Sequence, residues 1–377
     1  MRLFGCQACG NLLYFENRSC GQCGHRLAYL PHLATLSAME PGPDGSWTAL
    51  ARPGELRRFC ANADHDACNW LAPADGAEEP MCLACRHNSV VPDLTRAANL
   101  AAWRQLELAK HRLFYSLLRW RLPLKTAAEN PERALAFEFL ADPPSPAAPK
   151  VMTGHHCGTI TIALAEANDA EREKRRQSMG EPYRTLLGHF RHEVAHYYWD
   201  MLVKDGGELD SCRALFGEDT IDYGEALKRY YANDAPAGWQ ERFVSEYAAS
   251  HPWEDFAETW AHYLHIVDTL EMVAAAGMSV RLRVEGTTHQ KARVDFDPYG
   301  ARDIQQIIDT WLPFVLAMNS ICRAMGQPDL YPFVLAPAVI EKLGFVHRLI
   351  HREHVEESGE RQGIGVIEQK AAVTTGV

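Results

Sequence analysis

Two histidines separated by three residues, with a glutamate directly after the first, are the strongest chemical signal in this sequence. The residues are His192, Glu193 and His196, in the segment HEVAH. On an α-helix, side chains at positions i and i+4 lie on one face, so both imidazoles can bind one zinc ion. The glutamate beside them can take a proton from a water molecule held at that zinc. The motif therefore predicts the chemistry of a zinc metallopeptidase, with Glu193 as general base.

The residues around this motif predict a buried helix. Apolar side chains recur at helical spacing from Leu186 to Met201, a surface broad enough to bury the helix. His189 falls on the same stripe as the two histidines of the motif, and we expect it to support them from behind. Core histidines without a metal are the alternative, but three desolvated imidazoles without partners would be costly. We therefore favour a metal site.

A catalytic zinc needs a third protein ligand, because water takes the fourth position. The metzincin pattern would require Gly at 199 and His at 202, but the chain has Trp199 and Leu202, which excludes that class. A carboxylate on a later helix is the other common solution. Glu254 and Glu258 lie four residues apart just after Pro252, a residue suited to the first turn of a helix. One glutamate can bind the metal while the other orients a histidine.

Eight of the eleven cysteines fall in the first 85 residues and predict structural zinc sites. Two CxxC pairs, Cys6/Cys9 and Cys20/Cys23, have the spacing of a zinc ribbon. A module of roughly 30 residues cannot build a core alone, so the metal would supply its folding free energy.

A second set of cysteines predicts another structural zinc, although its spacing is less specific. Its members are Cys60, Cys68, Cys82 and Cys85. The second pair is CxxC, whereas seven residues separate the first pair. His65 or His87 could replace one thiolate, and buried free cysteines are the alternative to a metal site.

The remaining sequence predicts an α+β protein. We expect residues 1–95 to form a cysteine-rich zinc-ribbon region, 96–350 a mainly helical zincin-like domain with a small sheet, and 351–377 a polar, flexible tail. The turn-rich stretch from Pro41 to Gly45 is expected to be a linker. Apolar periodicity predicts a long helix from Leu94 to about Leu122, and a charged helix face over 171–177. Further helices are expected up to about residue 350.

Strict alternation of apolar residues predicts a half-buried strand over 158–165, before the HExxH helix. Zincins have an edge strand at this place, and a substrate could be held there by strand addition. The preceding residues His155, His156 and Cys157 could supply an inhibitory fourth zinc ligand. A loop with a buried cysteine is the interpretation that we favour for them.

Composition excludes several classes of protein. The 377 residues are 47% hydrophobic, as in globular proteins, and 38 basic against 49 acidic side chains give a net charge of −11, which disfavours nucleic acid as a partner. No stretch approaches the ~18 continuous apolar residues of a membrane span, and the N-terminus lacks a secretory signal. We therefore expect a cytoplasmic protein without membrane contact, whose cysteines stay reduced.

Taken together, these segments resemble a bacterial family of zinc-binding metallopeptidases with an N-terminal zinc ribbon. The resemblance rests on the ribbon, on FCANADHDACNW and MCLACRHN, on TLLGHFRHEVAHYYWD and on EDFAETWAHYLH. It covers the chain from Cys6 to about Leu349. The implied activity is zinc-dependent hydrolysis of a peptide or protein substrate.

The segment after Pro252 is also similar to gluzincin-type proteases, in which a helix reads E-x-F-A-E. That resemblance implies that Glu254 is the zinc ligand, that Glu258 has a supporting role, and that Tyr247 donates its hydroxyl to the oxyanion. Asp255 points to another face of the helix and is the weaker candidate. His262, two turns beyond Glu254, is expected to support the site or contact substrate.

Two other functions remain open from the sequence alone. The protein could be a weak or inactive enzyme that serves as an adaptor, with the zinc ribbon binding a protein partner. The intact HExxH motif argues against this, because an inactive descendant would often have lost Glu193. A nucleic-acid-directed protease or a zinc-ribbon accessory protein of transcription is the other alternative, which the negative charge disfavours.

Overall fold

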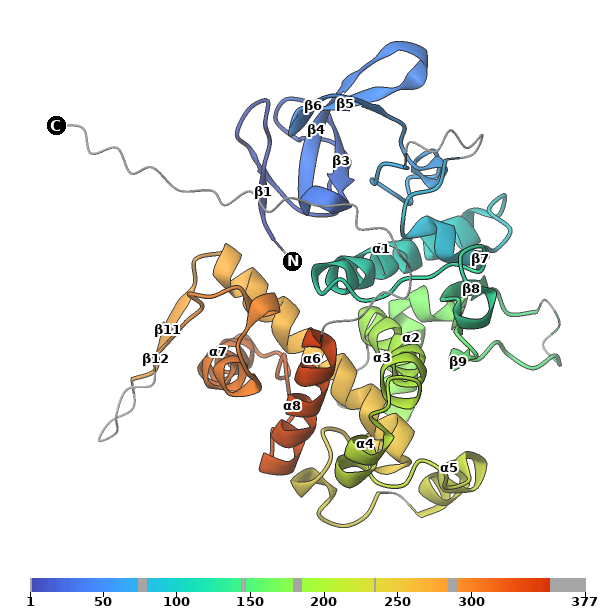
Figure 1. The fold of residues 1–377 in the computed structure, drawn as a ribbon, viewed down its shortest axis with the longest axis vertical. Helices are drawn as coiled ribbons and strands as arrows, with labels where there is room; N and C mark the ends of the chain where they lie inside the picture. Colours follow the sequence, from blue (N-terminus) through green and yellow to red (C-terminus); the bar gives the residue numbers. More distant parts are fainter. Residues whose placement is uncertain are drawn as a thin grey trace.

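The computed structural model describes residues 2–352 except 74–79, 144, 146, 179–184, 234 and 284–290. A cysteine-rich β module lies against a mainly helical domain, with the long helix α1 (Ala97–Arg119) between them (Figure 1). The predicted α+β class is therefore confirmed. The predicted tail lies outside the described residues, apart from 351 and 352.

The N-terminal module contains two small antiparallel sheets. Strands β1 (Phe4–Gly5) and β2 (Leu12–Leu13) form one of them. The other is a meander of β3 (Arg26–Leu30), β4 (Thr35–Pro41), β5 (Trp47–Ala49) and β6 (Arg52–Arg57). The linker expected from Pro41 to Gly45 is instead the turn that joins β4 to β5. Asp44 and Gly45 both have positive φ there, which lets the chain reverse tightly.

A mixed sheet lies beside the helices and has the strand order β7-β8-β10-β9. Its strands are β7 (Asn88–Val90), β8 (Ala136–Leu140), β9 (Gly154–His156) and β10 (Thr159–Ala163). The strand predicted over 158–165 is β10, with Ile160 and Ile162 buried as the alternation required. However, β10 pairs with β8 on one side and β9 on the other, so it cannot be the edge strand. In the part of the sheet that the structure describes, β9 is the edge nearest the HExxH helix.

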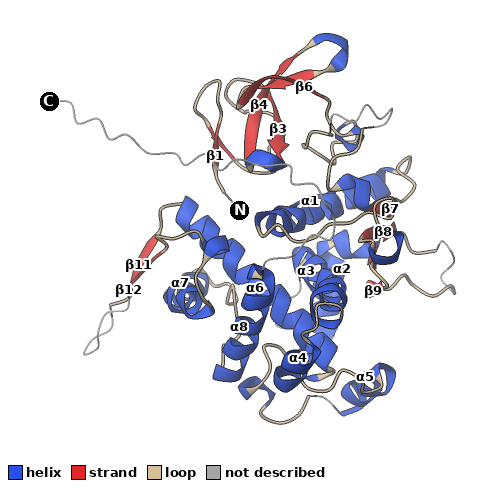
Figure 2. Cartoon of the chain, in the orientation of Figure 1, coloured by secondary structure: helices blue, strands red, loops and turns tan. Residues whose placement is uncertain are grey.

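Helices make up most of the rest of the domain (Figure 2). They are α2 (Asp169–Ser178), α3 (Leu186–Tyr198), α4 (Leu209–Phe216), α5 (Tyr223–Asn233), α6 (Pro252–Ala275), α7 (Ile304–Ala324) and α8 (Pro337–His351). Strands β11 (Ser279–Arg281) and β12 (Lys291–Arg293) form a separate antiparallel pair. The long helix and the later helices predicted from periodicity are thus confirmed.

Local sequence starts the two helices that carry the candidate ligands. Thr185 caps α3 by accepting a hydrogen bond from the Gly188 amide at 3.0 Å. Helix α6 begins with Pro252 in its first turn, after His251, whose side chain accepts from the Trp253 amide at 3.0 Å. Helices α3 and α6 pack closely against each other, which brings the two predicted motifs together.

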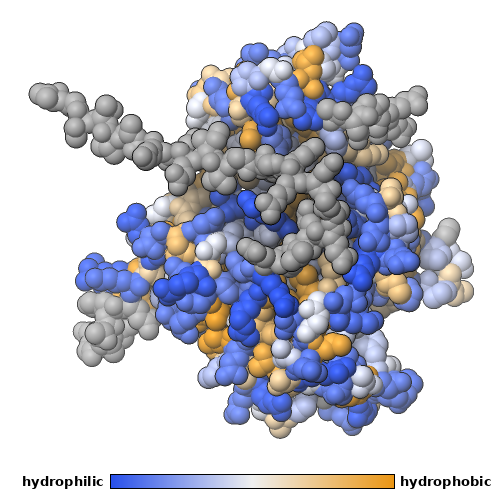
Figure 3. Space-filling view, viewed as in Figure 1, coloured by the Kyte–Doolittle hydropathy of each residue, from blue (hydrophilic) through white to orange (hydrophobic). Residues whose placement is uncertain are grey.

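One continuous core extends from the β module into the helical domain. Tyr115 of α1 contacts Phe15 edge to face, with ring centroids 5.4 Å apart, while α1 packs against α3 on its other side. The visible surface is mostly hydrophilic (Figure 3). Among the described residues, no helix combines the length and apolar character needed to cross a membrane.

Candidate active site

The HExxH motif of α3 faces the glutamate pair of α6. Glu254 Oε2 lies 2.9 Å from His192 Nε2 and 3.7 Å from His196 Nε2. All three donor atoms lie within 4.8 Å of one another, and all three side chains are largely buried. Two imidazole nitrogens and one carboxylate oxygen are a donor set of catalytic zinc sites. The residues present therefore fit a zinc ion with one open coordination position.

Glu258 approaches the other nitrogen of His192. Its Oε1 lies 2.7 Å from His192 Nδ1, and Ser245 donates a 2.6 Å hydrogen bond to its Oε2. The two glutamates thus contact opposite nitrogens of one imidazole, as expected if one binds the metal and the other orients the ring. Ser245 was not predicted, because it lies outside both motifs.

The charges of two of these groups suit metal binding directly. Burial lowers the pKa of His196 to about 3, so its imidazole is neutral and has a free electron pair. Burial alone would raise the pKa of Glu254, but the hydrogen bond with His192 brings it down to about 2, so Glu254 is a carboxylate. Burial lowers the pKa of His192, but its hydrogen bonds with Glu254 and Glu258 outweigh this effect and raise the pKa well above its usual value, so a metal ion would have to displace a proton from its Nε2. Burial raises the pKa of Glu193 to about 7, close to the value that a general base needs at neutral pH.

Two tyrosines lie beside the candidate ligands. Tyr247 belongs to a 3-10 turn (Tyr247–Ala249), and its ring centroid lies 6.0 Å from that of His192. Tyr223, the first residue of α5, donates a 2.8 Å hydrogen bond to Glu254 Oε1. Tyr247 was expected from the sequence, whereas Tyr223 was not, since no spacing rule connects Tyr223 to the HExxH motif.

Two family models match the chain. The model of a family described as "Putative zinc-binding metallo-peptidase" matches residues 99–349. The chain belongs to this family. A zinc-ribbon domain model matches residues 3–96, ahead of the metallopeptidase region.

Full-length relatives exist in mycobacteria. An uncharacterized protein of Mycobacterium bovis is 40% identical over 352 residues, which cover 93% of this chain and 95% of the relative. An uncharacterized protein of Mycobacterium tuberculosis matches to the same extent. No solved structure matches.

Strand β9 places a further histidine, His155, next to His196 of the HExxH motif. The ring of His155 stacks near that of His196, with centroids 5.9 Å apart, and its Nε2 accepts from the Gly158 amide at 3.0 Å. The expectation of a loop with a buried cysteine is wrong here. His155 and His156 are strand residues, whereas Cys157 is exposed and turns the chain at a φ of 45°.

The other predicted supporting residues of the metallopeptidase site lie farther out. His189 faces Glu166, with 3.2 Å between Nδ1 and Oε2. His262 shares a 2.7 Å hydrogen bond with the hydroxyl of Tyr331. Neither histidine joins the group of donor atoms around Glu254. Asp255 points away from that group, as expected, and pairs with Lys342 at 2.6 Å.

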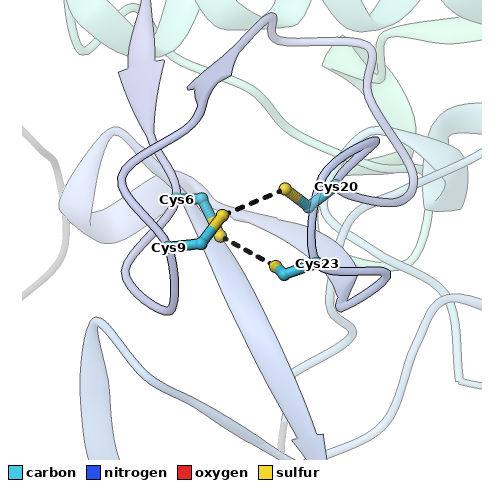
Figure 4. Close-up of side chains that lie close together, drawn as sticks. All are labelled: Cys6, Cys9, Cys20 and Cys23. Carbon is cyan, nitrogen blue, oxygen red and sulfur yellow. Dashed lines mark hydrogen bonds between the residues drawn. The ribbon is translucent and has the colours of Figure 1, made fainter.

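The first cysteine cluster has the arrangement of a zinc ribbon (Figure 4). Sulfur atoms lie 3.6 Å apart in both the Cys6–Cys23 and the Cys9–Cys20 pair. Hydrogen bonds from the backbone amides of its own turn lower the pKa of the Cys20 thiol to about 6. A thiolate of this kind is the form that binds zinc.

The second cluster is buried against α1. Its members, Cys60, Cys68, Cys82 and Cys85, are all buried, and their sulfur atoms lie within 4.8 Å of one another. Neither histidine considered as a substitute ligand belongs to this group. His87 Nδ1 lies 2.7 Å from the Leu135 carbonyl, and His65 contacts the ring of Trp103.

A different histidine, His111 of α1, lies at the second cluster. Its Nε2 is 3.3 Å from Cys68 Sγ and 3.7 Å from Cys85 Sγ. Glu107, one turn earlier on α1, is also buried and lies with its carboxylate near Cys85. Glu107 and His111 were not predicted; the signal for them in the sequence is a pair of ionisable residues one turn apart on a buried helix face.

Replacing Glu258 with glutamine is expected to weaken zinc binding at the HExxH site by about 10- to 100-fold. The neutral amide cannot hold His192 as the carboxylate does. Zinc bound at a series of fixed free zinc concentrations measures the effect. Glu225→Gln, an exposed change on α5, is the control. An unchanged affinity in Glu258→Gln would show that Glu258 does not orient the ligand.

Proposed function

We propose that this protein is a zinc-dependent peptidase whose catalytic metal is held by His192, His196 and Glu254. The convergence of these three buried side chains supports the proposal, together with the carboxylate of Glu258 behind His192. The family match supports metallopeptidase chemistry in general.

A zinc ion bound there would acidify a water molecule to a pKa of about 7 and polarise the scissile carbonyl. Glu193 accepts the proton of the attacking water and returns it to the leaving amine. The burial that raises the pKa of its carboxyl to about 7 supports both roles. The ring centroid of Tyr247 lies 6.0 Å from that of His192, and we assign to its hydroxyl the role of a donor to the developing oxyanion.

The free edge of β9 is the place that we propose for an extended peptide substrate. Among the described strands, none pairs with this side of β9, and His155 on β9 lies next to His196. A peptide added there would gain backbone hydrogen bonds and pass the candidate zinc ligands. This replaces the interior strand β10 as the substrate-binding strand.

The two cysteine clusters are proposed as structural zinc sites. Each offers four sulfur donors, which leaves no open coordination position for a substrate. The full complement would thus be one catalytic and two structural ions.

Zinc content and peptide cleavage test the proposal together. We expect about three zinc ions per chain in the parent protein, and about two in His192→Ala/His196→Ala and in Cys6→Ser/Cys9→Ser. The parent should cleave members of a peptide library, whereas the histidine variant should not. A histidine variant with the zinc content of the parent would contradict the catalytic site.

A further inference from the structure

The long segment between the two ligand helices contributes a residue to the candidate active site. Tyr223 begins α5, a helix in which Ala226 is the buried residue and most others are exposed. The tyrosine itself is 39% exposed, yet its hydroxyl reaches the buried carboxylate of Glu254. An otherwise exposed helix thus contacts a proposed metal ligand directly.

The hydrogen bond selects one oxygen of Glu254. Tyr223 donates to Oε1 at 2.8 Å, whereas Oε2 is the atom that lies near His192 Nε2 and His196 Nε2. The carboxylate is therefore held by one oxygen and presents the other to the two imidazoles. A free carboxylate could rotate or offer both oxygens, and each change would alter the geometry of the donor set.

His251 holds the start of α5 next to the first turn of α6. Its Nδ1 accepts from the Trp253 amide at 3.0 Å, so its Nε2 carries the proton and donates to the Ile221 carbonyl at 3.0 Å. One imidazole therefore links the first turn of α6 to the chain two residues before Tyr223. The ring of Tyr223 also packs against His251, with centroids 5.3 Å apart.

We propose that Tyr223 is a positioning residue that holds Glu254 as a one-oxygen metal ligand and so sets the zinc affinity of the active site. This inference rests on the proposed function, because it assumes a metal at the HExxH motif. The segment between α3 and α6 is then part of the active site and not only a connection between two helices.

Zinc affinity of the intact protein is the measurement that tests Tyr223. Bound zinc per chain is followed while a chelator holds free zinc at graded concentrations, and the binding step that is missing in His192→Ala/His196→Ala identifies the site. We expect Tyr223→Phe to require about 10-fold or more free zinc to fill this step, with the steps of the cysteine clusters unchanged.

A matched control is Tyr198→Phe. Tyr198 is a buried residue of α3 whose hydroxyl donates a 3.0 Å hydrogen bond to the Pro123 carbonyl, away from Glu254. The Tyr198→Phe variant loses a tyrosine hydrogen bond of similar length to that of Tyr223, and we expect it to bind zinc as tightly as the parent. His251→Ala, which releases the start of α5, should weaken zinc binding in the same direction as Tyr223→Phe.

The outcomes separate the two proposals. If the histidine double variant lacks one zinc but Tyr223→Phe binds as tightly as the parent, Tyr223 is not a positioning residue, and the proposed function stands. Equal loss of affinity in Tyr223→Phe and Tyr198→Phe would also overturn the role of Tyr223, because the effect would then be one of general stability. If the double variant keeps all its zinc, the proposed function itself fails.

Discussion

Replacing Glu193 with glutamine is expected to lower kcat/KM for peptide hydrolysis by about 10³-fold, within the range of general acid–base catalysis. The amide has the shape of the carboxylate but cannot take a proton from water. Glu193 does not belong to the group of converging donor atoms, so the zinc content should stay that of the parent. Steady-state hydrolysis of a peptide selected from the library measures the change.

Glu218→Gln is a suitable control for Glu193→Gln. Glu218 is an exposed residue of the turn after α4, and its side chain contacts Arg213. This variant should hydrolyse peptides at the parental rate. If Glu193→Gln also kept that rate with zinc bound, another group would have to accept the proton, and the proposed role of Glu193 would be wrong.

Removal of the CxxC pair of the second cysteine cluster is expected to have the largest effect on stability. In Cys82→Ser/Cys85→Ser, two sulfur donors are lost from a cluster that lies in the buried core beside α1. For structural zinc sites, the binding free energy is also folding free energy. We expect about one zinc fewer and a fall in Tm of about 10 °C or more, since each kcal/mol shifts Tm by about 2–4 °C in a domain of roughly this size.

Calorimetry and zinc analysis together check this expectation. Cys212→Ser is the matched control, because Cys212 is a buried cysteine outside both clusters. It should keep the zinc of the parent and lose little stability. A double variant that retained the zinc content of the parent would show that the second cluster consists of free thiols.

The sequence predicted the helices of the site better than its side-chain contacts. Periodic apolar residues predicted a helix over 94–122, and α1 spans Ala97–Arg119. The HExxH spacing is itself a property of a helix, so it places His192 and His196 on one face before any tertiary contact is known. The spacing of Glu254 and Glu258 likewise places both glutamates on one face of α6. Their contact with His192 then depends only on the packing of that face against α3.

Contacts between residues that are far apart in the sequence could not be predicted from periodicity and spacing. Tyr223 meets Glu254 because His251 joins the starts of α5 and α6, and no periodic pattern records that hydrogen bond. His111 reaches the second cluster because α1 packs against the β module, whereas the histidines predicted as substitute ligands, His65 and His87, are close to the cysteines only along the chain. The edge position of β9 depends on strand order, which alternation within one strand does not determine.

The shortness of β9 has a consequence for what the proposed enzyme could cut. Three residues, Gly154 to His156, offer a backbone edge that only an extended chain can follow. A helix satisfies its own amides and carbonyls internally, so it would have to unwind before it could lie along this edge. Cleavage would then depend on how readily a segment of the target protein becomes locally unfolded, and well-folded proteins would be spared even when they contain a favourable sequence.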